Sequence, residues 1–188
     1  MKTKTILITG GESGVGAATA RALAAQGHRV LFTCREAEDG AQLCTDITTA
    51  FPRAMVKSYS LDLASFSSIR LLADKLQREY NQIDVLINNA SLAPLTKQKT
   101  RDGFELQFGA NYLGHFLFTQ LLLEVLNEAG RARIVHTSSM MHWLGGVDFG
   151  SFHGGKFYDP IRAYAQSKLA ILLFSNELSR RLKKTKIT

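Results

Sequence analysis

The sequence predicts an α/β fold in which a doubly wound parallel sheet is covered by helices on both faces. Short apolar runs of strand length alternate with segments of helical periodicity along the 188 residues, and this alternation indicates a parallel sheet. The run "DVLI" is apolar throughout, as expected for a strand buried on both sides. No repeat or linker divides the chain, so residues 1–188 are taken as a single domain.

The elements follow one another in order along the chain. Five runs are expected to be strands: 5–10, 29–34, 54–59, 83–90 and 132–139. Five segments are expected to be helices: 15–26, 37–50, 65–80, 103–128 and 160–184. Pro52 and Pro94 fall in connections. Pro160 opens the last helix, where proline is tolerated because the first helical residue needs no N–H partner.

Composition and charge narrow the functional classes. No run reaches the roughly 18 apolar residues of a membrane span. The apolar run after "MKTK" is too short for a signal peptide, which predicts a cytoplasmic protein. Five of the basic residues behind the net charge of +7 stand in "RRLKKTKIT" (180–188), and without them 18 basic residues face 16 acidic ones. This near-neutral body, without a basic and aromatic face, argues against nucleic-acid binding.

Neither the cysteines nor the histidines predict a metal site. Cys34 and Cys44 form no C-x-x-C pair and are expected to be reduced, packed thiols. His136, His142 and His153 do not stand at a metal-ligand spacing, so no metal is expected.

A glycine-rich turn, "TGGESGVG", follows the first strand at residues 9–16 and opens a helix. Glycines at such a turn let the backbone approach a pyrophosphate, and the helix N-terminus offers free N–H groups and a positive dipole end. A tight turn without a ligand is the alternative. The position of the turn, directly after the first strand of a β-α-β unit, favours dinucleotide binding.

The end of the second strand predicts which dinucleotide is bound. An acidic residue there binds the ribose hydroxyls of NAD, whereas arginine accommodates the 2′-phosphate of NADP. The sequence is "LFTCRE": Cys34 occupies the position expected for the acid, and Arg35 follows it. A guanidinium forks well onto phosphate, so NADP(H) is favoured over NAD(H), although Glu36 stands next to Arg35.

Polar residues also follow the third and fourth strands. Asp62 could accept a hydrogen bond from the adenine amino group, or could lie at the start of the next helix, which Ser65 is able to cap. Asn88 and Asn89 stand at a strand end, where open α/β sheets bind ligands, and ordinary turn asparagines are the alternative.

Tyr164 and Lys168 are separated by just over one helical turn, so both side chains lie on the same face of the last helix. A phenol is a poor base at neutral pH, but a neighbouring ammonium stabilises the phenolate. Such a tyrosine can give a proton to a carbonyl or take one from an alcohol. A solvated polar stripe is the alternative, which the glycine turn and the serines at the end of the fifth strand make less attractive.

Together these motifs resemble the short-chain dehydrogenases/reductases, a family with the Rossmann fold. "TGGESGVG" matches the family turn T-G-x-x-x-G-x-G, "NNAS" matches N-N-A-G, "SS" matches the catalytic serine, and "YAQSK" matches Y-x-x-x-K. The segments "CRE", "NYLGHFLFT" and "AYAQSKLAILLFSNELSRRL" are similar to the branch of retinol dehydrogenases and the WW-domain oxidoreductase. The resemblance covers essentially the whole chain.

The resemblance implies a role for each matching residue. Tyr164 is the general acid/base, Lys168 supports it and binds the nicotinamide ribose, and Ser139 polarises the substrate oxygen, with Ser138 as the other candidate. Asn111 would hold a water that links Lys168 to solvent. The reaction implied is hydride transfer between NADP(H) and an apolar carbonyl or alcohol. The predicted cofactor site comprises Gly10, Glu12, Ser13, Gly14, Val15, Gly16, Arg35, Asp62, Leu63, Asn89 and Ala90, together with Tyr164 and Lys168.

Two departures from the family pattern affect these expectations. Ser91 replaces the glycine of N-N-A-G, and binding is expected to survive this small change. The sequence ends at Thr188, where the family enters a sixth strand, so the last two strands and the substrate loop are expected to be missing and the sheet edge to be exposed. A redox sensor or regulator without turnover is therefore the alternative to an enzyme. The family also implies a homo-oligomer interface on helices 103–128 and 160–184.

Overall fold

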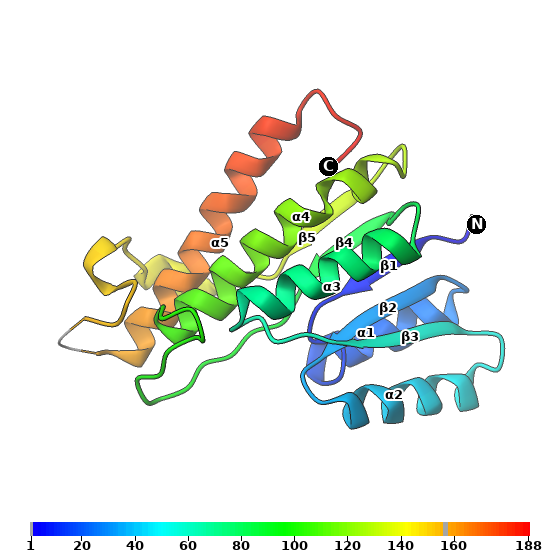
Figure 1. Ribbon diagram of the computed structural model, residues 1–188, viewed down its shortest axis with the longest axis horizontal. Coiled ribbons are helices and arrows are strands. Elements are labelled where there is room, and N and C mark those ends of the chain that lie inside the picture. The colour runs from blue at the N-terminus through cyan, green and yellow to red at the C-terminus, as the bar shows by residue number, and fades with distance from the viewer. Residues whose placement is uncertain (1, 156–157) are drawn as a thin grey trace.

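The computed structural model of the protein describes residues 2–155 and 158–188. These residues form one parallel sheet of five strands in the order β3-β2-β1-β4-β5 (Figure 1). The strands are β1 (Thr5–Ile8), β2 (Arg29–Cys34), β3 (Met55–Ser60), β4 (Val85–Asn88) and β5 (Arg133–His136). The predicted fold class is confirmed, and four of the five strands lie within their predicted runs, while β3 extends one residue past 54–59 to Ser60.

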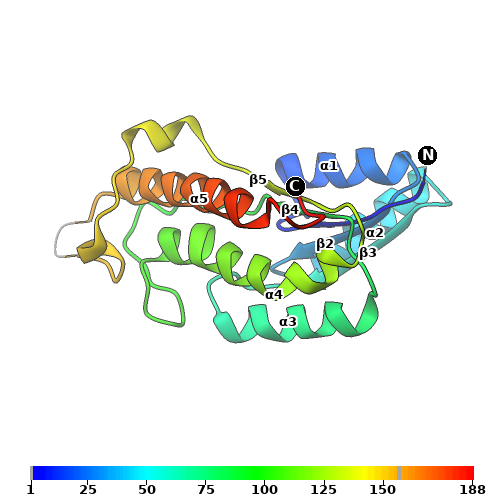
Figure 2. The ribbon, with the colours of Figure 1, turned by 90° about the horizontal axis from the view of Figure 1, so that it is seen from above.

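Helices cover both faces of this sheet. Five are α-helices: α1 (Gly14–Ala25), α2 (Ala37–Ala50), α3 (Phe66–Glu79), α4 (His115–Asn127) and α5 (Pro160–Leu182). Figure 2 shows the sheet between α1 on one side and α3 and α4 on the other. Shorter helical turns are the π-helix Phe108–Gly114 and the 3-10 helices Met140–Leu144 and Phe149–Ser151. No helix in the described part of the chain is long and apolar enough to cross a membrane.

Alternating strand residues divide the core into two layers. Leu7, Leu31 and Leu86 join α3 and α4 in one buried cluster, while Ile6 and Phe32 join α1 and α2 in the other. Successive strand side chains point to opposite faces, so a central strand must be apolar on both. This explains the unbroken apolar runs of the sequence.

The strand order reverses between β1 and β4, and this reversal determines where a ligand can bind. The chain proceeds from β1 outward to β3 on one side and then returns to place β4 on the other side of β1. Helices leave the two neighbouring strand ends in opposite directions, which opens a crevice at their carboxyl ends. The glycine turn after β1 and the asparagines after β4 both lie at this crevice.

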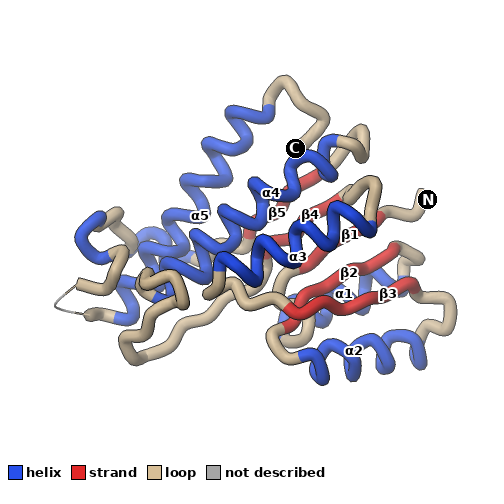
Figure 3. Tube along the Cα trace, in the orientation of Figure 1, coloured by secondary structure: helices blue, strands red, loops and turns tan. Residues whose placement is uncertain are grey.

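One helix boundary was predicted wrongly. Residues 103–105 were expected to be helical, but Lys99 and Glu105 form an antiparallel bridge, helical backbone begins at residue 106, and a loop separates β4 from it (Figure 3). The Glu105 carboxylate accepts hydrogen bonds from the backbone N–H groups of Gln107 (2.9 Å) and Phe108 (2.7 Å). These are N–H groups that a helix start leaves without partners, so Glu105 fixes where the helix begins.

The last three residues pair with the first part of β5. Ile187 forms a parallel bridge with Ala132, and the Ile134 N–H donates to the Thr188 carbonyl at 2.8 Å. Ile187 is buried, whereas Val135 further along β5 is 39% exposed. The expected exposed sheet edge is therefore limited to the carboxyl end of β5, and the position of a sixth strand is already occupied at its beginning.

Candidate active site

The glycine turn brings its own backbone close enough that a side chain would not fit. Gly10 and Gly14 have φ angles of +63° and +51°, a region that favours glycine. A Cβ on Gly16 would lie 2.0 Å from the Gly10 carbonyl oxygen and 2.8 Å from Asn89 Nδ2. Ser13, at the N-cap of α1, makes no capping bond with its side chain. The first N–H groups of α1 are thus left for a ligand, as a pyrophosphate site requires.

A buried hydrogen-bond network holds this turn against β4 and the π-helix. Thr9 Oγ1 accepts bonds from the N–H groups of Asn89 (2.9 Å) and Ala90 (3.0 Å) and lies 2.8 Å from His115 Nε2. A hydroxyl has one proton and two lone pairs, so Thr9 donates to Nε2. His115 Nδ1 then carries the ring proton and donates it to the Asn111 carbonyl at 2.9 Å. Burial lowers the pKa of His115 to about 4, which keeps this ring neutral.

A cleft of about 320 Å³ runs along the carboxyl ends of β1, β2 and β4. Its walls include seven of the predicted site residues: Gly10, Glu12, Arg35, Asp62, Leu63, Ala90 and Asn111. Ser13, Gly14, Val15 and Gly16 belong to the adjoining turn and the start of α1, where Val15 is 73% exposed. Six of the thirteen predicted cofactor residues therefore line the cleft and four adjoin it in the turn, whereas Asn89, Tyr164 and Lys168 do not line it.

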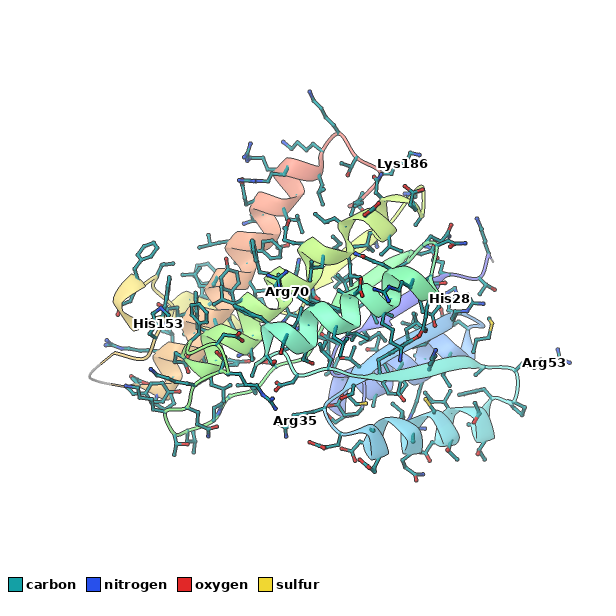
Figure 4. The ribbon with its side chains drawn as sticks, viewed as in Figure 1. His28, Arg35, Arg53, Arg70, His153 and Lys186 are labelled. Carbon is teal, nitrogen blue, oxygen red and sulfur yellow. The ribbon has the colours of Figure 1, made fainter. Side chains whose placement is uncertain are left out.

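Arg35 and Asp62 both line this cleft, but the Asp62 side chain is held more firmly than that of Arg35. The Arg35 side chain is 75% exposed at the end of β2, and its Nε lies 3.7 Å from Glu36 Oε1 (Figure 4). Ion pairs this exposed contribute little, so Arg35 is free to turn toward a phosphate. Asp62 accepts a bond from the Ala64 N–H at 2.9 Å and lies 3.5 Å from Arg101 Nε. Its carboxylate thus already has partners on the wall of the cleft.

The two asparagines after β4 act as braces. Asn89 Nδ2 donates to the carbonyl oxygens of Thr9 (3.0 Å) and Gly10 (3.1 Å). Asn88 Nδ2 donates to Thr119 Oγ1 on α4 at 2.8 Å and lies 3.1 Å from His136 Nδ1. Neither amide lines the cleft. Their side chains fix the glycine turn and the sheet in position, while Asn89 as a cofactor contact remains a prediction.

Tyr164 and Lys168 lie together near the start of α5. The Asp159 carboxylate caps this helix by accepting the Ile161 N–H at 2.9 Å. Lys168 is only 3% exposed, and its Nζ donates to the Thr137 carbonyl at 3.2 Å and lies 5.4 Å from the centre of the Tyr164 ring. Burial lowers the pKa of Lys168 below its ordinary value. A solvated stripe does not describe this pair, because the lysine is enclosed and directed at both β5 and the tyrosine.

The two serines after β5 differ in what their hydroxyl protons do. Ser138 Oγ donates to the Lys168 carbonyl at 2.9 Å, so its proton is already engaged. Ser139 Oγ accepts a bond from the Met141 N–H at 3.2 Å, which leaves its own proton for a substrate oxygen. This difference favours Ser139 over Ser138 as the substrate-polarising residue.

The Asn111 side chain is fully engaged. Its Oδ1 accepts from the Leu92 N–H (2.9 Å), and its Nδ2 donates to the Leu92 carbonyl (2.9 Å) and to Ser167 Oγ (3.2 Å). Ser167 Oγ in turn donates to the Tyr164 carbonyl at 2.7 Å. The side chain therefore ties the loop after β4 to α5. The water relay through Asn111 remains a prediction.

The residues around Ser139 present apolar side chains to solvent. Met140 and Trp143 are 84% and 80% exposed, on the 3-10 helix Met140–Leu144. This turn nonetheless lies close against α5, because a Cβ on Gly145 would come within 2.6 Å of the Ala165 carbonyl. The backbone is packed and the side chains form an exposed apolar rim beside the serine.

The faces expected to form an oligomer interface contain an apolar groove. It has a volume of about 450 Å³, lies between the π-helix, the start of α4 and α5, and includes Phe108, Tyr112, Phe116 and Phe174. The oligomer itself remains a prediction. In residues 2–155 and 158–188, no group of three His, Cys, Asp or Glu side chains is placed to hold a metal ion.

Comparison with known proteins places this site in a family. A family model described as short chain dehydrogenase matches residues 4–188. Retinol dehydrogenase 11 of Homo sapiens is 44% identical over 185 residues, which cover 98% of this chain and 58% of that protein. The chain thus spans little more than half the length of this relative.

Solved structures show the same fold. The crystal structure of an uncharacterised protein from Mycobacterium paratuberculosis superposes with a TM-score of 0.87 at 40% identity, covering 98% of this chain and 65% of the other. RhlG of Pseudomonas aeruginosa, whose structure is an NADP active-site complex, superposes with a TM-score of 0.79 at 26% identity, covering 98% of this chain and 68% of the other.

Proposed function

The chain belongs to the short-chain dehydrogenase family, and from this membership we propose that it transfers hydride between NADP(H) and an apolar carbonyl or alcohol. The observation that carries the proposal is the enclosed Lys168, whose Nζ lies 5.4 Å from the centre of the Tyr164 ring and donates to the carbonyl of Thr137, two residues before Ser139. A structural helix stripe has no need of a buried lysine, since burying an ammonium is costly.

The residues of the cleft fit a nicotinamide dinucleotide. Gly16 has no room for a Cβ, and the start of α1 is not capped by Ser13, which are the conditions for backbone N–H groups to face a pyrophosphate. Arg35 stands at the strand end with a mobile guanidinium, which supports the 2′-phosphate of NADP(H). When bound, the nicotinamide supplies or accepts the hydride.

The residues of the protein supply the proton and the orientation. Tyr164 gives its phenolic proton to the substrate oxygen in the direction of reduction, and the Lys168 ammonium favours the phenolate that results. Ser139 donates its free proton to the same oxygen and holds the substrate in line. Met140 and Trp143, which follow this serine in the sequence, expose uncharged apolar side chains, and this surface favours an apolar substrate.

The test separates an enzyme from a redox sensor or regulator without turnover. Wild type, Tyr164→Phe and Tyr112→Phe are assayed with NADPH and a panel of apolar aldehydes and ketones that includes retinal. NADPH oxidation is expected for wild type and for Tyr112→Phe, which removes a phenol whose ring packs against Phe108 and Phe174. Tyr164→Phe is expected to lose at least about a hundredfold in rate, as for a general acid. Equal inactivity of all three proteins, with NADPH still bound, would favour the sensor.

A further inference from the structure

Glu12, in the middle of the glycine turn, carries a buried carboxylate oxygen that has no partner. Its Oε2 is enclosed and makes no hydrogen bond to any residue of the described chain. The side chain lines the cleft together with Cys34 and Arg35. An enclosed carboxylate oxygen without a donor costs free energy, so a ligand donor toward which the Glu12 side chain turns would gain from pairing with it.

Glu12 lies close to the end of β2, since the neighbouring Gly11 N–H donates to the Thr33 carbonyl at 2.9 Å and both Glu12 and Cys34 line the cleft. Burial, and after it the charge of Glu12, raise the pKa of Cys34 to about 11. Cys34 occupies the position at which such folds carry the acid that binds the ribose hydroxyls of NAD. The structure therefore brings a carboxylate to this place from the glycine turn, although none is present at the strand end itself.

The part of the cleft next to Arg35, where the adenosine of a dinucleotide would lie, therefore carries charges of both signs. Arg35 is the basic residue on its wall, while Glu12, Glu36, Asp39 and Asp62 are acidic. Glu36 and Asp39 are exposed to solvent, which screens their charges, whereas Glu12 is partly buried and its charge is screened less. A 2′-phosphate would meet the attraction of Arg35 and the repulsion of Glu12 together.

We propose that Glu12 accepts hydrogen bonds from the adenosine ribose hydroxyls, and that its charge opposes Arg35 so that the cleft binds NAD(H) as well as NADP(H). Glu12 is then the residue that sets the ratio of the two affinities. This inference rests on the proposed function in taking the cleft as the dinucleotide site. A metal ion is not an alternative ligand, because no third metal ligand accompanies Glu12 in the described ranges.

The experiment measures the dissociation constants of NADH and NADPH on the 188-residue chain by fluorescence titration. The proteins are wild type, Glu12→Gln, Glu12→Ala, Arg35→Ala and the control Glu38→Gln, which removes an exposed acid of α2 that does not line the cleft. Repulsion between Glu12 and the pyrophosphate is common to both nucleotides. The ratio of the two constants therefore isolates the effect at the ribose, and it does not depend on the folded fraction.

Glu12→Gln is expected to shift the ratio roughly tenfold toward NADPH, the effect of removing one like-charge contact. Glu12→Ala is expected to weaken NADH roughly tenfold as well, because the bond to a charged acceptor is lost. Arg35→Ala should shift the ratio toward NADH, and Glu38→Gln should leave it unchanged. A ratio within twofold of wild type in Glu12→Gln, or an equal shift in Glu38→Gln, overturns the inference.

The inference and the proposed function fail in different ways. Normal turnover with a Glu12→Gln ratio like that of wild type refutes only the role of Glu12. A shifted ratio without turnover of any carbonyl supports the role of Glu12 and refutes the enzyme. Failure of the wild-type chain to bind either nucleotide refutes both.

Discussion

Replacing Thr9 with valine tests the network that holds the glycine turn. Valine keeps the shape of the side chain and removes the hydroxyl, which is fully buried and joins three groups. The backbone N–H groups of Asn89 and Ala90 and the Nε2 atom of His115 would each lose their partner. An unsatisfied buried polar group costs roughly 1–3 kcal/mol, so Thr9→Val is expected to lower the free energy of unfolding by at least about 3 kcal/mol.

Thr9→Ser is the matched control because it keeps the hydroxyl and removes only a methyl group, at a cost of about 1 kcal/mol. Both variants are compared with wild type by urea unfolding followed by circular dichroism. The expected loss is a large fraction of the roughly 5–15 kcal/mol that stabilises an ordinary domain. A loss below about 1 kcal/mol for Thr9→Val, or equal losses for the two variants, would refute the reasoning that these bonds hold the turn.

Two other substitutions test the same region. Burial lowers the pKa of His115 to about 4 in the folded chain, against an ordinary value of 6.5, so the unfolded chain binds the extra proton first and stability falls as the pH drops from 6.5 toward 4. Between about pH 7.5 and about pH 5, His115 alone should lower the free energy of unfolding by about 2 kcal/mol. The glutamine in His115→Gln stays neutral, so urea unfolding of this variant should depend less on pH. An unchanged pH dependence would contradict the assignment. Gly16→Ala places a Cβ 2.0 Å from the Gly10 carbonyl oxygen and should weaken NADPH binding at least about tenfold in a fluorescence titration. Gly146→Ala is the control, because nothing lies within 4 Å of its Cβ, and it should leave the affinity unchanged. Similar affinities of the two variants would show that the turn has more room than the structure indicates.

Much of the fold follows from the sequence because the strands of a central parallel sheet are apolar on both faces. The runs at β1, β2 and β4 have this pattern, and all three were found where the sequence placed them. The start of the helix before α4 was missed because it depends on Glu105. The Glu105 carboxylate caps two backbone N–H groups, and a cap of this kind does not change the spacing of apolar residues from which helices are predicted.

The candidate site was predictable where it consists of local motifs. The pairing of Tyr164 with Lys168 depends on helical spacing, and Gly16 on a local turn, and the structure brings each into the expected position. Thr9, His115 and Ser167 were missed as functional residues, because their importance depends on contacts between distant segments. A histidine within the apolar segment "GHFLFT" was the one available signal, since a buried polar ring needs partners.

The same buried residues connect the glycine turn to the start of α5, which carries Tyr164. His115 joins Thr9, at the end of β1, to the carbonyl of Asn111 in the π-helix. Asn111 Nδ2 binds Ser167 Oγ, and Ser167 binds the carbonyl of Tyr164. This continuous series of short bonds runs through buried side chains, where water does not compete and an unpaired member is costly. A reaction between a bound dinucleotide and a proton donor requires these two parts to be held within fractions of an ångström. Thr9, His115 and Ser167 do not line the cleft, so their replacement should affect stability and the position of Tyr164 before it affects chemistry.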